Sequence, residues 1–346
     1  MNPMIWTILI STLATSTIIT MSSHHWILAW LGLELNTLSI LPIITKPQHP
    51  RAIEAATKYF LIQTTAAALI LFASAINAWQ TGNWNITLSS ATTPNIIILS
   101  AILLKMGIAP AHLWYPDIIQ GTNMLTALTI STWQKLAPLT LLYLTINHMP
   151  TPTLLTTGLL SVVVGGWAGL NQTQTRKIMA FSSIAHMGWL IIALTMNPAL
   201  ATLTMTIYLL MTTTMFFSLT TTTTKTLQDL GTTWTYSPPL LAMTILTLTS
   251  LGGLPPLAGF MPKLLILKEL TMTKLGLLST VLALMSLPSL YFYTRMAYLT
   301  ILTTPPNTTC TTHKWRFKPN PKTNPTLIMS MATMTLPLMP LLYTHT

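Results

Sequence analysis

The sequence predicts an all-α protein, a polytopic bundle of about eleven helices that crosses a membrane. Three observations predict this fold class. Lys and Arg number 16 and Asp and Glu 5, so charged residues make up 6 % of 346, against roughly 25 % in an ordinary soluble domain. Hydrophobic residues make up 51 %, and the mean hydropathy is +0.59. The apolar runs are long and do not alternate with polar residues, which indicates helices and excludes a membrane barrel.

The predicted spans follow one another from the N-terminus. A helix that crosses the hydrocarbon core needs about 20 mainly apolar residues. Segments of Pro, Gly, Asn or charge separate such windows, which cover residues 3–21, 25–45, 52–78, 95–113, 122–146, 153–170, 177–196, 199–222, 238–267, 275–300 and 325–343. The longest polar segments, 80–94 and 301–324, are too short to bury a core, so we expect a single integral membrane domain over 1–346.

The loop cations predict the orientation. Counted on alternate sides, nine Lys and Arg residues fall on the side of the N-terminus and two on the other. The first group is Lys46, Arg51, Arg176, Lys177, Lys225, Lys314, Arg316, Lys318 and Lys322, and the second is Lys268 and Lys274. The positive-inside rule then places the N-terminus in the cytoplasm, or in the matrix for an organellar protein, and the C-terminus opposite. The cations of 313–318 are expected to anchor the chain at the membrane surface, and no nucleic-acid partner is expected.

Apart from the charged residues near span ends, four charged residues lie inside the predicted spans: Glu34, Lys105, Lys135 and Lys263. Each opposes insertion by about 2.5 to 3.5 kcal/mol at a helix centre. A long Lys side chain near a helix end can reach the headgroups, which is the structural alternative to a function, and it applies best to Lys263. Glu34 is too short for this and requires an internal Lys partner or a water-filled cavity.

Two predicted spans contain Pro and Gly beside a lysine, in KMGIAPAHLWYPD and LGGLPPLAGFMPK. Proline removes a helical donor and frees a carbonyl that hydrocarbon cannot satisfy, so both helices are predicted to be broken. The stretches align at an offset of 146 residues, for example Gly107 with Gly253 and Pro110 with Pro256. The alignment predicts two five-helix repeats, 1–150 and 151–300, inverted because five is odd, followed by 301–346 with a C-terminal helix.

These residues predict proton transfer. Burial disfavours a charged ammonium, and a nearby carboxylate favours it, so a Lys with a movable carboxylate partner can bind and release a proton. We expect Glu34 and Lys105 to pair, with Lys135 and Lys263 as further stations and His112 and His186 as possible secondary relays. A packing role for each histidine is the alternative. Cys310 is the sole cysteine, and no metal or cofactor site is expected. The glycines of GGWAG at 165–169 are expected to pack helices.

The motifs KMGIAPAHLWYPDIIQG, WQKLAP, RKIMAFSSIAHMGW and GGLPPLAGFMPK, in this order, resemble the antiporter-like membrane subunits of respiratory complex I. The resemblance implies that Glu34 and Lys105 form the charge pair, that Lys135 is the central proton carrier and that Lys263 is the terminal one. It also implies that NADH, FMN, iron-sulfur clusters and ubiquinone are bound by other subunits. Its implied partners are the other complex I subunits, including neighbouring antiporter-like ones, and membrane lipids.

The resemblance implies the mitochondrial inner membrane, with the N-terminus in the matrix and the C-terminus in the intermembrane space. Two other functions stay open on the sequence. One is a stand-alone antiporter that exchanges a monovalent cation for protons, which would retain ion flux without redox partners. The other is a structural membrane subunit whose ionisable residues move no protons.

Overall fold

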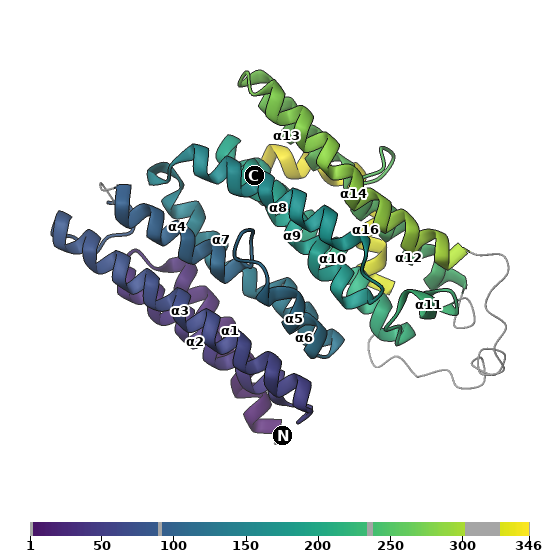
Figure 1. Ribbon diagram of the computed structural model, residues 1–346, viewed down its shortest axis with the longest axis horizontal. Coiled ribbons are helices and arrows are strands. Elements are labelled where there is room, and N and C mark those ends of the chain that lie inside the picture. The colour runs from purple at the N-terminus through teal and green to yellow at the C-terminus, as the bar shows by residue number, and fades with distance from the viewer. Residues whose placement is uncertain (1–2, 89–91, 234–237, 302–325, 346) are drawn as a thin grey trace. The chain divides into compact units, whose positions relative to one another are not determined.

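The computed structural model describes residues 3–88, 92–233, 238–301 and 326–345, and in these ranges the regular structure is helical (Figure 1). This confirms the all-α prediction. Two compact units, Met1–Thr157 and Gly158–Thr346, divide the chain, and the boundary falls within α8 (Thr151–Leu170). The basic segment 313–318 and Cys310 lie outside the described residues.

In the first unit, successive helices pack on one another: α1 on α2, α2 on α3, and α3 on both α4 and α5 (Figure 1). Its elements are α1 (Pro3–Ser22), α2 (Trp26–Thr45), α3 (Pro50–Thr81), α4 (Thr92–Met106), α5 (Trp114–Gly121), α6 (Met124–Ser131), the short 3-10 helix η1 (Trp133–Lys135), α7 (Leu136–Thr145) and η2 (Ile146–His148). Histidine side chains cap the N-termini of α2 and α3. The His25 side chain accepts from the Ile27 amide and the His49 side chain accepts from the Arg51 amide, both at 3.2 Å.

In the second unit, α10 packs against α9, α12 and α16, and α14 packs against α12 and α13. The elements that follow α8 are α9 (Thr175–Met196), α10 (Pro198–Thr222), α11 (Leu227–Leu230), α12 (Pro238–Gly252), α13 (Phe260–Met272), α14 (Gly276–Ile301) and α16 (Thr326–His345). Asn197 caps α10 by accepting from the Ala199 amide at 3.0 Å, with Pro198 at the first helical position, where its missing N–H costs nothing.

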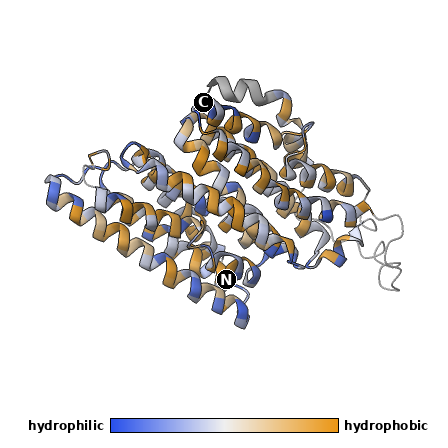
Figure 2. Ribbon diagram, turned by 45° about the horizontal axis from the view of Figure 1, so that its top comes forward, coloured by the Kyte–Doolittle hydropathy of each residue, from blue (hydrophilic) through white to orange (hydrophobic). Residues whose placement is uncertain are grey.

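Seven described helices are long and apolar enough to cross a membrane: α1, α2, α3, α8, α9, α10 and α14. The other four predicted spans correspond to α4, to α6 with α7, to α12 with α13, and to α16, whereas α5 lies between two predicted spans. Hydrophobic residues run along the full length of the helices in Figure 2. Large apolar side chains are exposed in mid-helix, with Leu61 62 % and Phe72 58 % accessible. In water this surface would drive aggregation, whereas lipid covers it.

The two predicted helix breaks are confirmed, and they share one backbone geometry. Gly107 ends α4 with φ +67°, and Gly253 follows α12 with φ +83°. In the first break the Ile108 amide bonds to the Leu103 carbonyl at 3.0 Å, and in the second Leu254 bonds to Thr249 at 3.3 Å. This is the Schellman arrangement, in which a left-handed residue closes the helix end.

A third break was not predicted. The expected span 122–146 is interrupted by η1, which carries Lys135. Pro138 lies just beyond and has no N–H to donate to the carbonyl of Gln134, so one helical hydrogen bond is missing at this turn. Lys135 therefore sits on distorted backbone, as Lys105 and Lys263 sit beside broken helices.

The GGWAG glycines pack helices, as expected. A Cβ on Gly165 would lie 2.7 Å from the Ala185 amide nitrogen of α9, and one on Gly169 would lie 2.9 Å from the Phe292 ring of α14. Only glycine permits these close approaches.

Each unit also joins two of its own loops by an isolated β-bridge. In the first unit His25 pairs with Asn85, which links the loop after α1 to the loop after α3. In the second unit Gln174 pairs with Thr226, which links the loop after α8 to the loop after α10. The bridge thus joins the loops that follow the first and third helices of each unit.

Replacing Gly107 should destabilise the chain more than replacing Gly82. Both have positive φ, but a Cβ on Gly82 would meet nothing within 4 Å, whereas one on Gly107 would lie 3.1 Å from Cβ of Tyr115. We expect Gly82→Ala to lower the free energy of unfolding by about 1 kcal/mol through backbone strain alone, and Gly107→Ala to lower it further. Unfolding in detergent, followed by circular dichroism, measures both; equal losses would contradict the close contact.

Candidate functional site

Lys105 lies at the end of α4, where its side chain is buried and 6 % of the residue is exposed. Its ammonium donates to the carbonyl of Gln63 on α3 at 3.4 Å, and the Gln63 amide donates back to the Lys105 carbonyl at 3.3 Å. This reciprocal pair joins α3 to α4 and gives the buried charge a polar partner. Position and burial exclude snorkelling to the headgroups.

Lys135 is 2 % exposed, and its Nζ lies 4.8 Å from the centroid of the Tyr115 ring, within range of a cation–π contact. It lines one small cavity, of about 10 Å³, together with Lys105. The other lining residues are Tyr59, Gln63, Met106, Trp114, Tyr115, Ile130 and Gln134. The structure therefore brings two of the predicted site residues to one buried cavity.

Glu34 lies on α2 and is half-buried. Its carboxylate accepts from the Thr37 hydroxyl at 3.1 Å. It makes no direct ion pair with Lys105, whose ammonium bonds to the Gln63 carbonyl. The carboxylate and the ammonium thus have separate hydrogen-bond partners.

A chain of neutral polar groups that was not predicted from the sequence lies beside these residues. Gln134 donates to Asn36 Oδ1 at 2.9 Å and accepts from the Tyr59 hydroxyl at 3.3 Å. The adjacent residue is Lys135, so Gln134 ties the turn that carries this lysine to α2 and α3. The available signal was an amide side chain inside an apolar span, since a buried amide needs partners as a buried charge does.

His112 lies within the first break, half-buried, and its Nδ1 contacts the carbonyl of Pro110 at 3.1 Å. It is not among the residues that line the cavity of Lys105 and Lys135. The structure places this histidine next to the broken backbone and does not bring it to the two lysines.

In the second unit, Lys263 lies near the start of α13, and its ammonium donates to the carbonyl of Gly252 at 3.0 Å. Gly252 is the last residue of α12, so the lysine satisfies a carbonyl that the helix break leaves without its helical donor. The aliphatic stem folds over Gly253, where an added Cβ would lie 3.2 Å from the lysine Cδ.

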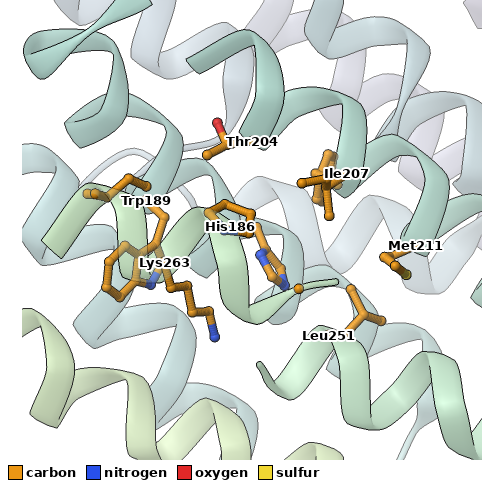
Figure 3. Close-up of a pocket in the computed structure, with 11 residues that line it drawn as sticks. His186, Trp189, Thr204, Ile207, Met211, Leu251 and Lys263 are labelled. Atoms are coloured by element: carbon orange, nitrogen blue, oxygen red, sulfur yellow. The ribbon is translucent and has the colours of Figure 1, made fainter. Parts of the chain in front are cut away.

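His186 and Lys263 line the same cavity, of about 30 Å³, and Figure 3 shows both side chains there. His186 Nε2 lies 3.3 Å from the Tyr293 hydroxyl, and the Tyr208 ring packs against the imidazole with centroids 5.8 Å apart. Two tyrosines thus orient the histidine. The structure brings these two predicted site residues together within the second unit.

Within the described residues, no group of three or more His, Cys, Asp or Glu side chains could hold a metal ion. The ionisable groups that line the two cavities are three lysine amines, one imidazole and three tyrosine hydroxyls. The amines and the imidazole can bind and release protons.

Comparison with known proteins identifies the family. The model of the NADH:quinone oxidoreductase/Mrp antiporter membrane region matches residues 23–288, and the NADH dehydrogenase subunit 2 C-terminus model matches 290–343. NADH-ubiquinone oxidoreductase chain 2 of Carassius auratus is 50 % identical over all of both chains. The Xenopus laevis protein of that name is 48 % identical over 99 % of this chain and all of its own.

Solved structures agree. A chain of respiratory complex I from Thermus thermophilus with bound aureothin is similar at a TM-score of 0.80 and 26 % identity, over 96 % of this chain and 78 % of that one. A chain of the Mrp complex from Dietzia sp. shares the fold at a TM-score of 0.77 and 14 % identity, over 87 % of this chain and 61 % of that one. The chain therefore belongs to the NADH-ubiquinone oxidoreductase chain 2 family of antiporter-like membrane subunits.

Proposed function

We propose that this chain is a proton-translocating membrane subunit of NADH:ubiquinone oxidoreductase, in which Glu34, Lys105, Lys135 and Lys263 carry the protons. The observation that supports this most strongly is the single cavity lined by Lys105 and Lys135. Ionisable side chains buried inside a membrane oppose folding there, and such residues mark ion and proton paths.

Glu34 controls the first step. In this proposal the negative charge of Glu34 stabilises the protonated form of Lys105, with which it shares no direct hydrogen bond. When the carboxylate is neutralised or withdrawn, the Lys105 ammonium loses this stabilisation and releases its proton toward Lys135. The separate hydrogen-bond partners leave the carboxylate free to change its distance without breaking a bond to the lysine.

His186 acts beside Lys263 in the second unit, because both line one cavity and imidazole titrates near neutrality. His112 is a secondary proton relay at the first break, where its Nδ1 contacts the Pro110 carbonyl. Reduction of ubiquinone by NADH takes place in other subunits, which hold the FMN and iron-sulfur clusters, and supplies the free energy. The other complex I subunits, including neighbouring antiporter-like ones, and the membrane lipids are the partners.

The segments 1–150 and 151–300 are inverted repeats, and the segment 301–346 follows them. The shared Schellman geometry at Gly107 and Gly253 supports the alignment, as do the β-bridges between the loops after the first and third helices of each unit. Five spans separate the equivalent bridges, so they lie on opposite sides of the membrane. In the proposed orientation the N-terminus is in the mitochondrial matrix and the C-terminus in the intermembrane space.

The family model, which also covers the membrane region of Mrp antiporters, leaves one other candidate, a cation/proton antiporter that works alone. That candidate requires ion flux in vesicles that contain this chain without redox partners. A purely structural subunit requires that neutral substitution of Lys135 leaves pumping unchanged.

Replacing Lys105 by Met should abolish or greatly reduce the proton pumping that this chain contributes, because Met fills the space but carries no proton. Proton uptake and NADH oxidation are measured together with the assembled complex in proteoliposomes. Lys268→Met, at an exposed position of α13, is the matched control and should pump normally. An assembled Lys105→Met complex with unchanged pumping would show that this lysine is not on the path.

Cysteine labelling tests the orientation. In a Cys310→Ser background, Asn83→Cys and Pro47→Cys place thiols in exposed loops that the span count assigns to opposite sides. In mitochondria stripped of the outer membrane, a membrane-impermeant maleimide should label Cys at position 83 and not at position 47. Inverted inner-membrane particles should give the opposite result. The reverse labelling in both preparations would invert the proposed topology.

A further inference from the structure

Trp114, the first residue of α5, brings a hydrogen-bond donor without an acceptor to the cavity of Lys105 and Lys135. The residue is 7 % exposed, and among the described residues its buried indole Nε1 has no hydrogen-bond partner. A buried indole N–H usually finds a partner, and an exception calls for an explanation such as an ordered water.

The indole cannot turn away to find another acceptor. It makes edge contacts with Tyr59, at 6.1 Å between ring centroids and 63° between planes, and with Tyr115, at 5.6 Å and 88°. Its Cζ2 edge also faces Gly107, where an added Cβ would lie 3.3 Å away. The ring is therefore held rigidly against the first helix break.

The cavity has the size of one water molecule. Its volume is about 10 Å³, close to the minimum of roughly 10 to 15 Å³ that holds one water, which also needs about two to four polar partners. The residues that line the cavity can supply them: the Trp114 N–H and the Lys105 ammonium as donors, and the neutral amine of Lys135 and Gln134 Oε1 as acceptors.

We propose that this cavity binds one water molecule, held by the Trp114 N–H between Lys105 and Lys135, and that Trp114 is a positioning residue for the proton step between the two lysines. The inference rests on the proposed function and adds the site through which its first transfer passes.

The step balances in atoms and charge. An N–H bond of protonated Lys105 breaks, and its proton bonds to the water oxygen. An O–H bond of that water breaks, and the proton bonds to the neutral amine of Lys135. The water is regenerated and nothing is oxidised or reduced. The Trp114 N–H donates to one lone pair of the water throughout. The Lys105 ammonium donates to the other lone pair, and an O–H of the water therefore points toward Lys135.

Two substitutions of the same kind test the role of the N–H. Trp114→Phe keeps an aromatic ring at the cavity and removes the donor. Trp26→Phe is the matched control, because Trp26 is 1 % exposed, its indole nitrogen also lacks a partner, and it does not line this cavity. Trp114→His, which restores a ring N–H, is the rescue variant.

The assembled complex in proteoliposomes is the sample, and protons moved per NADH oxidised is the readout. We expect Trp114→Phe to lower the water occupancy of the site about fivefold, which is the population change typical of one lost hydrogen bond. The rate of proton transfer through this chain should fall by the same factor. Trp26→Phe should equal the parent, and Trp114→His should recover part of the loss. An unchanged ratio for Trp114→Phe would overturn the inference.

A high-resolution cryo-electron microscopy map provides a second, independent readout, which remains decisive if Trp114→Phe fails to assemble. The parent complex should show one water within hydrogen-bond distance of Trp114 Nε1 and of a lysine Nζ. Ordered water elsewhere in the map and none here would overturn the inference. If Lys105→Met loses pumping and Trp114→Phe does not, only this inference is contradicted. If Lys105→Met pumps normally, the proposed function is contradicted.

Discussion

A buried ammonium group in a membrane must have polar partners, and much of this structure follows from that constraint. Lys105 bonds to a backbone carbonyl of α3, and Lys263 bonds to the carbonyl at the end of α12. Lys135 stands on a 3-10 turn beside a tyrosine ring. Each lysine lies beside backbone that leaves the regular α-helix, where polar groups are available that an intact helix would consume in its own hydrogen bonds.

The helix breaks therefore serve both the fold and the chemistry. The break after α12 provides the Gly252 carbonyl to which Lys263 donates, and small cavities lined by the lysines lie beside the breaks. The hydroxyl groups of the many Thr and Ser residues mostly bond back to carbonyls one turn earlier, as Thr214 does to Met211 at 2.7 Å. These residues add polarity to the sequence without adding unsatisfied groups to the membrane interior, so the four intramembrane charges remain the chemical exceptions.

The all-α membrane fold, the breaks at Gly107 and Gly253 and the candidate lysines were predictable, because apolar length, proline and charge act locally along the chain. The break at Lys135 was not predicted, although Pro138 removes a helical hydrogen-bond donor there. What could not be predicted is which groups meet. The contact of Gln134 with Asn36 and Tyr59, and the shared cavity of His186 and Lys263, depend on how distant helices pack. His112, equally plausible in the sequence, lies apart from the lysine cavity.

The central claim is that Lys105 and Lys135 act in series on one proton path. Protons moved per NADH oxidised, measured for Lys105→Met, Lys135→Met and the double variant, test it most directly, because residues on one path are not additive. The account predicts that either single variant loses the contribution of this chain and that the double variant loses no more. Single variants that each lose part, with a double variant that loses the sum, would show independent routes and contradict it.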